Sequence, residues 1–156
     1  MITHLQFRPY NPSHDQSPVM ELFRSNLNPY FTAEEEAEFR HFLSENFPYF
    51  VGELETEQGK CIVASGGYAM NARYAVLTWG MVARQFHGQG IGRAFIRFRI
   101  NECREAYPNT AIEIETSQHT APFYEKLGFR TLSIQPDKWG PNLHLVHMLF
   151  DADATL

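Results

Sequence analysis

The chain has few of the features that mark membrane proteins, disulfide scaffolds or nucleic-acid-binding proteins. No stretch of its 156 residues approaches the roughly 20 consecutive apolar residues that a membrane-spanning helix requires. Only two cysteines occur, Cys61 and Cys103, and they form no C-x-x-C pair, so we interpret both as reduced residues, with a disulfide or metal role as the alternative. The net charge of −5 argues against nucleic acid as the main partner.

The remaining composition is that of an ordinary globular protein. Residues 1–8 lack the apolar core of a signal peptide, which together with the cysteine usage predicts a cytoplasmic protein. Apolar residues make up 44% of the chain and charged residues 20%, and the length favours a single domain over residues 1–156 with a substantial core.

Three glycines at alternate positions form the most informative feature. Gly88, Gly90 and Gly92 lie between an apolar run that ends at Val82 and a helical pattern that begins near Ile91. Glycine lets the backbone turn tightly and approach a ligand closely, because it has no Cβ. The first amides of the following helix lack intrahelical partners and lie at the positive end of its dipole, so the segment is predicted to cradle a pyrophosphate.

Two other glycine-rich phosphate motifs do not fit this segment. A Walker A loop requires Gly-Lys-Ser or Gly-Lys-Thr, which occurs nowhere in the chain. The dinucleotide-binding fingerprint requires an acidic ribose-binding residue about 20 residues further on, and none is evident.

Charge is distributed unevenly along the chain. Residues 84–104 carry five arginines against one glutamate, and residues 31–57 carry eight glutamates against one arginine. The basic segment could attract a polyanionic cofactor and the acidic segment a cationic amine, although each could equally be a solvated helix face.

Apolar periodicity and turn residues predict seven strands and four helices. The predicted strands cover residues 2–10, 50–55, 60–70, 74–82, 111–116, 130–134 and 143–150, with a loop over 136–142. The predicted helices cover residues 16–26, 91–107 and 120–127, and a fourth runs from an N-cap at Thr32, with Glu35 completing a capping box, to about residue 45.

Two motifs together resemble those of the Gcn5-related N-acetyltransferase (GNAT) superfamily. Gln85-x-x-Gly88-x-Gly90 is followed, 36 residues after Gly88, by Tyr124 in the run Phe-Tyr-Glu-Lys-Leu-Gly-Phe. The resemblance covers about residues 50–150. It implies an α/β (α+β) fold with a mixed central sheet of about seven strands flanked by about four helices, in which strands 4 and 5 splay apart and admit the cofactor.

The same resemblance implies that the cofactor is acetyl-CoA, with no metal. The expected pyrophosphate ligands are the backbone amides of His87, Gly88, Gln89, Gly90, Ile91 and Gly92, supplemented by the guanidinium of Arg93 or Arg84. The pantetheine arm is expected beside Met81, Val82 and Ala83, with Ser117 at a position where the family often has asparagine. His144 and His147 lie three apart on a strand, on opposite faces, and form no metal pair.

For catalysis, the resemblance points to Tyr124 as the general acid. A tyrosine with a reference pKa of about 10 stays protonated at neutral pH and can protonate a departing thiolate. The alternative is that Tyr124 only packs its helix onto the sheet. Glu115 is our candidate for the general base, with His119 as another option, although Glu115 could simply be a solvated or cross-strand residue.

The predicted activity is acetyl transfer to a primary amine by direct attack in a ternary complex. The acceptor is expected to be a small molecule or a peptide, bound near the acidic and aromatic residues 28–38, with no nucleic acid or membrane involved and a homodimer possible. The alternatives are a non-catalytic regulator that binds acyl-CoA and an interaction domain that has lost its cofactor.

Overall fold

A computed structural model describes residues 4–156, so Ile2, where the first strand is predicted to start, lies outside the described residues. The helices are α1 (Pro12–Ser25), α2 (Glu35–Leu43), α3 (Ile91–Ala106) and α4 (Ala121–Lys126), with a 3-10 turn η1 (Arg84–Phe86). The strands are β1 (Leu5–Pro9), β2 (Tyr49–Thr56), β3 (Gly59–Met70), β4 (Ala75–Val82), β5 (Ile112–Thr116), β6 (Arg130–Gly140) and β7 (Leu143–Phe150).

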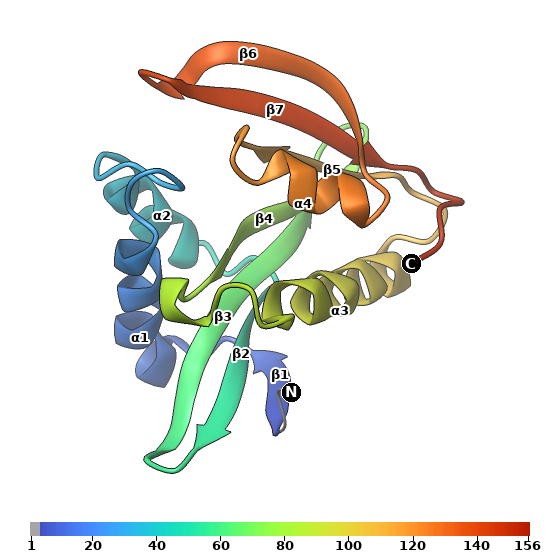
Figure 1. The fold of residues 1–156 in the computed structure, drawn as a ribbon. Helices are drawn as coiled ribbons and strands as arrows, with labels where there is room; N and C mark the ends of the chain where they lie inside the picture. Colours follow the sequence, from blue (N-terminus) through green and yellow to red (C-terminus); the bar gives the residue numbers. More distant parts are fainter. Residues whose placement is uncertain (1–3) are drawn as a thin grey trace.

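The seven strands form one mixed sheet in the order β1-β2-β3-β4-β5-β7-β6 (Figure 1). Neighbouring strands are antiparallel except β4 and β5, which are parallel. These two strands pair only where they begin, at Ala75 with Ile112 and at Val76 with Glu113. Beyond Val76 they diverge, which confirms the predicted GNAT arrangement and leaves a gap in the middle of the sheet.

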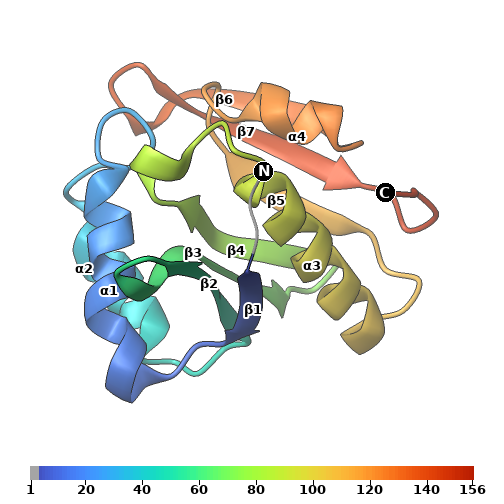
Figure 2. The ribbon, with the colours of Figure 1, turned by 60° about the horizontal axis from the view of Figure 1, so that its bottom comes forward.

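Helices cover both faces of the sheet, as two views of the ribbon show (Figures 1 and 2). On one face, Val19 and Phe23 of α1 and Phe39 of α2 pack with Val51 of β2. On the other face, the buried side of α3 packs with strand residues such as Val63. The gap between β4 and β5 is therefore bordered by α1 and α2 on one side and by α3 and α4 on the other.

A bulge distorts β3 and β4 beside this gap. The pairing of the two strands shifts register between Ser65 and Gly67, and Trp79 has a φ of 40°. The Trp79 ring lies against Phe39 of α2, with 4.9 Å between the ring centroids. A bulge leaves backbone groups without ladder partners, and side chains bind three carbonyls here, two of them through one arginine described below.

Several element boundaries differ from the sequence-based predictions by one or more residues, and three of these differences have an identifiable cause. Helix α1 begins at Pro12 rather than at residue 16, because the Asn11 side chain caps it by accepting from the Ser13 N–H at 2.9 Å, and proline fits the first turn, where its missing N–H costs nothing. Helix α2 begins at Glu35, one turn after the predicted cap, although the Glu35 carboxylate still accepts from the Thr32 N–H at 3.0 Å.

The third difference lies in β6, which runs to Gly140 instead of stopping at residue 134. The predicted loop over residues 136–142 is therefore mostly strand. Asp137 has a φ of 57°, and the pairing with β7 shifts register between Gln135 and Gly140. This irregular hairpin brings Trp139 over the sheet, where its Nε1–H donates to the Thr116 carbonyl at 2.9 Å.

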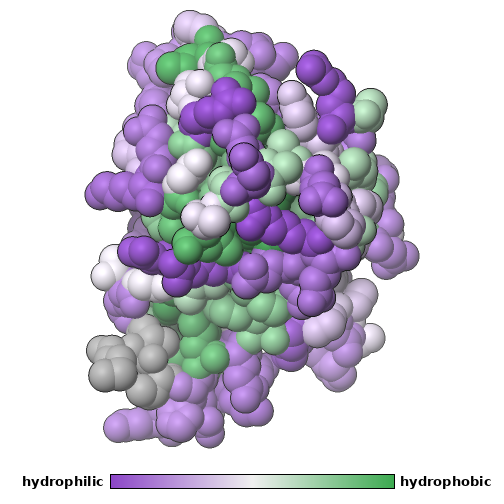
Figure 3. All heavy atoms as spheres, turned by 90° about the vertical axis from the view of Figure 1, so that its right-hand side faces the viewer, coloured by the Kyte–Doolittle hydropathy of each residue, from purple (hydrophilic) through white to green (hydrophobic). Residues whose placement is uncertain are grey.

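The outer surface is mixed in character. On the side shown in Figure 3, hydrophobic residues are interrupted by hydrophilic ones. None of the helices within residues 4–156 is long and apolar enough to cross a bilayer.

Candidate functional site

A central cleft of about 620 Å³ passes through the gap between β4 and β5. Its walls come from both faces of the sheet. We call one part the glycine end, formed by the segment 86–93 with α3 and α4, and the other the aromatic end, formed by residues 30–38 with Trp79, Glu115, His119 and Trp139. Residues 30–38 and 139 are far apart in sequence, and the cleft brings them together.

The glycine end has an open backbone. Gly88 and Gly90 have φ values of 78° and 85°, a left-handed conformation that favours glycine, and no atom lies within 4 Å of where a Cβ would stand at either position. Gly90 is the N-cap residue of α3 and supplies no side-chain cap, so the first amides of this helix face the cleft without a side-chain partner. Gly92 differs, because a Cβ there would lie 3.4 Å from the Phe123 ring.

Most of the predicted cofactor residues line this end of the cleft. His87, Gly88, Gly90, Gly92, Arg93, Met81, Val82 and Ser117 all contribute to its wall. The Ile91 side chain instead points into the core and is 1% exposed. Gln89 Nε2 lies 3.5 Å from the Gln85 carbonyl. The Ala83 N–H donates to the Val63 carbonyl at 2.8 Å, so this amide already has a partner in the sheet.

The end of β4 is held by side chains from two other segments. The Val82 carbonyl accepts from Asn26 Nδ2 at 2.9 Å and lies 2.8 Å from His87 Nε2, which fixes a proton on that nitrogen. Asn26 is only 3% exposed and also donates to the Leu22 carbonyl at 2.9 Å. Sequence reasoning missed Asn26, because it closes α1 at a distance of 56 residues from its partner.

Arg84 connects the glycine end to the aromatic end. Its Nη2 donates to the carbonyls of Leu27 and Asn28, at 3.0 and 2.9 Å, and its guanidinium lies 5.4 Å from the centroid of the Tyr30 ring. The Tyr30 ring in turn lies edge-on to His87, with centroids 5.4 Å apart. Through these contacts, Arg84 links the turn that precedes the glycines to the segment that forms the aromatic wall.

Tyr124 lies on α4 at the glycine end and is 7% exposed. Its ring packs edge-on against Phe129, with 5.4 Å between centroids, while its hydroxyl makes no hydrogen bond within residues 4–156. Burial raises the pKa of the Tyr124 phenol and the charge of Arg99 opposes this, but the net direction is upward. The phenol is therefore a proton donor throughout the neutral range.

The two strand glutamates have different surroundings. Glu113 is bonded to Asn71 and, at 2.6 Å, to His147 Nε2, and it lies outside the cleft. Glu115 is exposed, lies on the cleft wall and opposes His147 in the strand register. Only Glu115 of this pair is available to a ligand in the cleft.

Ser117, which also lines the cleft, stabilises the turn before α4 through two hydrogen bonds. Its Oγ accepts from the His119 N–H at 3.2 Å, and its carbonyl accepts from the Ala121 N–H at 2.9 Å. These bonds shape the turn that leads into α4 and so help to place Tyr124.

The aromatic end combines flat rings with carboxylates. Phe31 and Trp79 lie 5.9 Å apart, centroid to centroid, and Trp139 contributes from β6. Glu35 and Glu38 lie on the same wall. Burial raises the pKa of the Glu35 carboxyl, although its bonds to the backbone and hydroxyl of Thr32 partly oppose the rise. Such a wall suits a ligand that carries positive charge.

Arg99 is the largest departure from the sequence interpretation, which counted it among the basic charges of residues 84–104. It is 1% exposed and lines the cleft from beneath, so it adds nothing to the surface charge. The helical spacing of the sequence indicates this burial, because Arg99 lies four residues after Phe95 and four before Cys103, on the apolar side of α3.

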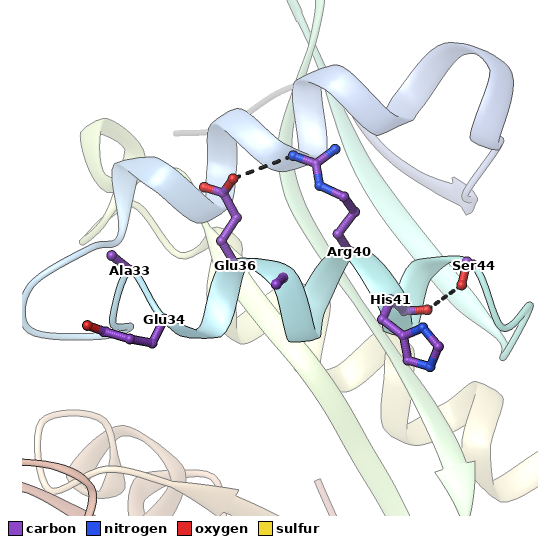
Figure 4. Close-up of a pocket in the computed structure, with 7 residues that line it drawn as sticks. Ala33, Glu34, Glu36, Arg40, His41 and Ser44 are labelled. Atoms are coloured by element: carbon purple, nitrogen blue, oxygen red, sulfur yellow. Dashed lines mark hydrogen bonds and ion pairs between the residues drawn. The ribbon is translucent and has the colours of Figure 1, made fainter.

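A second hollow, on the outer face of α2, is more open and does not reach the cleft (Figure 4). Its polar groups pair with one another: Arg40 Nη2 lies 3.5 Å from the Glu36 carboxylate, and Ser44 Oγ donates to the His41 carbonyl at 2.6 Å. Within residues 4–156 no cluster of three His, Cys, Asp or Glu side chains could hold a metal ion. Both cysteines are free thiols.

Comparisons with known proteins agree with this geometry. The family model described as acetyltransferase (GNAT) domain matches residues 28–151. No curated protein matches the chain by sequence. Three solved structures illustrate the likeness in fold.

The ribosomal-protein-S18-alanine N-acetyltransferase of Escherichia coli has a TM-score of 0.75 at 18% identity, covering 97% of this chain and 96% of the other. An aminoglycoside 6'-N-acetyltransferase complexed with coenzyme A has a TM-score of 0.72 at 13% identity, covering 97% and 99%. A variant of spermidine N-acetyltransferase from Vibrio cholerae has a TM-score of 0.71 at 16% identity, covering 96% and 94%.

The matched family model defines the protein as an acetyltransferase, and the parallel, splayed pair of strands fits that class. The chain belongs to the GNAT acetyltransferase family, because the family match covers most of its length.

Proposed function

We propose that the protein transfers the acetyl group of acetyl-CoA directly to a primary amine of a small cationic molecule, within a single domain and in a ternary complex. The observation that carries this proposal is the central cleft itself. It runs through the gap between β4 and β5 and connects an open phosphate-type cradle, a buried phenol and an acidic, aromatic wall.

The glycine end fits a phosphorylated carrier. The left-handed Gly88 and Gly90 leave free space above the backbone, and the uncapped start of α3 offers amides to a pyrophosphate. Arg93 on the first turn of α3 adds a positive charge. Acetyl-CoA supplies a thioester, whose carbonyl carbon takes the amine and whose sulfur leaves as a thiolate.

Proton transfers balance this exchange. The new C–N bond forms as the C–S bond breaks, Tyr124 gives its hydroxyl proton to the sulfur, and solvent later restores that proton. The ammonium loses two protons in all: Glu115 accepts one, directly or through water, and passes it to solvent, and the second leaves to solvent as the amide forms. An ammonium group of reference pKa about 10.4 costs several kcal/mol to deprotonate at neutral pH, so a nearby base increases the reactive fraction.

The aromatic end favours a cationic acceptor. Glu35, Glu38 and Glu115 add three carboxylates to the cleft that Phe31 and Trp79 also line. An acceptor with a second positive charge could bind these groups while its reacting amine enters the gap. Enzymes of this fold are named for acceptors as different as spermidine, an aminoglycoside and an alanine of ribosomal protein S18. The cleft wall of this chain therefore provides the main support for its acceptor class.

Calorimetry with acetyl-CoA, followed by thiol release with spermidine, kanamycin and an alanine-initiated peptide, tests the proposal. We expect saturable binding and amine-dependent release, fastest with the polycationic amines. Binding without release from any amine would favour a regulator that only senses acyl-CoA. Faster release with the peptide would overturn the acceptor class alone.

Glu115→Gln tests the proposed base. We expect kcat to fall by about 10²-fold, because general base catalysis typically contributes that much, while the affinity for acetyl-CoA is unchanged. The loss should be greatest at low pH and should shrink as solution pH rises, since a larger fraction of the free amine is then already neutral. Steady-state kinetics between pH 6 and pH 9 measure this.

Glu125→Gln is the matched control, because it makes the same change at an exposed residue of α4 that does not line the cleft. Its kinetics should equal those of the wild type. A Glu115→Gln enzyme with wild-type kcat at every pH would shift the role of base to His119.

A further inference from the structure

The guanidinium of Arg99 lies buried beneath the central cleft and has no anionic partner. The side chain is 1% exposed, and Arg99 forms no ion pair within residues 4–156. Burying an unpaired charge is costly, so such a residue usually persists for a reason other than stability.

Two glycines make room for this group. A Cβ on Gly66 would lie 2.7 Å from Arg99 Cζ, and a Cβ on Gly80 would lie closer still to Arg99 Nη1. Neither glycine has a left-handed φ, so the space for Arg99, rather than the backbone conformation, requires glycine at these positions. The hollow therefore belongs to the bulge of β3 and β4.

The bulge also provides the hydrogen-bond acceptors. Arg99 Nη2 donates to the carbonyls of Gly67 and Thr78, at 3.0 and 2.9 Å, and Nε donates to Gly67 at 3.3 Å. The neighbouring Trp79 carbonyl is bound by the Tyr49 hydroxyl at 2.8 Å. Neutral dipoles thus hold the guanidinium without cancelling its charge.

The titratable groups that face Arg99 come from three elements and are all neutral near pH 7. They are Tyr49 on β2, Cys103 on α3 and Tyr124 on α4, and burial raises the pKa of each. The pKa of the Cys103 thiol is raised to about 11. The positive charge therefore acts on the cleft above it, where Tyr124 also lies.

We propose that Arg99 is a positioning residue for acetyl transfer: it fixes the bulge of β4 beside the thioester and keeps an uncompensated positive charge next to the site at which the thiolate departs. This inference rests on the proposed function. A cation in a water-poor site stabilises a developing anion far more than it would in water. By lowering the basicity of the departing sulfur, Arg99 makes it a better leaving group and reduces its dependence on protonation by Tyr124.

Coenzyme A bound to the protein provides a readout that is independent of turnover, since its thiolate absorbs in the ultraviolet. We expect the thiol of bound coenzyme A to titrate about one pH unit higher in Arg99→Gln than in the wild type, because a nearby cation lowers a thiol pKa by about that much or more. Arg99→Lys retains the charge and should titrate close to the wild type. Glu115 and His119 also face the cleft and are the same in all three proteins.

Kinetics give a second readout. Arg99→Gln should lower kcat by about 10²-fold, the typical loss for one electrostatic contact in an acyl-transfer site, with the Kd for coenzyme A changed by less than about threefold. Arg99→Lys should recover most of that loss. A purely structural role predicts equal losses in both variants, in step with their unfolding midpoints, and an unshifted thiol titration, and that result would overturn the inference.

Gly66→Ala keeps the proposal testable if Arg99→Gln does not fold. It retains every donor and the charge but displaces the guanidinium, so it should raise the thiol pKa towards the Arg99→Gln value. Gly52→Ala on β2 is its control, since a Cβ there is also tight, 3.2 Å from the Ala64 Cβ, but its nearest neighbours are Ala64 and Phe7 and not Arg99. Wild-type protein that does not bind coenzyme A would overturn the proposed function and this inference with it. Binding with an unchanged titration in Gly66→Ala would overturn the inference alone.

Discussion

Gly90→Glu is expected to weaken acetyl-CoA binding at least ~100-fold, because a carboxylate placed against an anionic ligand costs several kcal/mol. Gly90 is the N-cap residue of α3, at the positive end of the helix dipole, and no atom of the protein lies within 4 Å of the new Cβ. The side chain would therefore occupy space that the proposed pyrophosphate needs. Isothermal titration of acetyl-CoA measures the effect.

The substitution also strains the backbone, since a non-glycine residue at a φ of 85° costs about 1 kcal/mol or more. Gly59→Glu is a matched control for this strain. Gly59 has a φ of 105°, no atom within 4 Å of a Cβ, and a place in the β2–β3 turn outside the cleft. It should lose similar stability and bind acetyl-CoA normally. Normal binding by Gly90→Glu itself would refute the cradle.

Tyr124→Phe is expected to reduce kcat by about 10²- to 10³-fold, the usual contribution of a positioned general acid, with little change in acetyl-CoA affinity. The hydroxyl has no hydrogen-bond partner within residues 4–156, so its removal should not lower the unfolding midpoint. Because burial raises the pKa of this phenol, the wild type should keep its acid form to a more alkaline pH than an ordinary tyrosine does, and Tyr124→Phe should lack the alkaline decline in kcat.

Tyr107→Phe makes the same chemical change at a half-buried tyrosine that packs against the same core but does not line the cleft. Its kcat should match the wild-type value. If Tyr124→Phe also retains full turnover, then Tyr124 serves only to pack α4, and another group or water protonates the sulfur. The fold assignment would be unaffected.

The sequence predicted the strands next to the cleft more accurately than the edges of the fold. Strands β2, β3 and β4 have one or two buried sides, so their apolar residues mark their extent. Residues 130–138 of β6 are all exposed, so burial does not mark the extent of this strand, and Pro136, Asp137 and Gly140 in its outer half are typical of turns, so that half resembled a loop. The predicted helix lacked the first turn of α1, because Pro12 was interpreted as a break and not as the start of a helix.

The residues of the candidate site also fall into those that the sequence predicted and those that it did not. The glycine segment and Tyr124 were predictable, because each depends on residues adjacent in sequence and on a known motif. Asn26 and the bulge at Trp79 depend on contacts between distant segments. Arg99 was misinterpreted because arginine is rarely fully buried, and only its place between Phe95 and Cys103 on the helix indicated otherwise.

The link through Arg84 has a consequence for the order of events at the site. Arg84 sits in the turn just before the glycines and binds the carbonyls of Leu27 and Asn28, which carry Tyr30 and Phe31 into the aromatic wall. A carrier that shifts this turn must also move the acceptor wall. Thermodynamic linkage then makes the two affinities reciprocal, so an acceptor must alter the affinity for the carrier by the same factor.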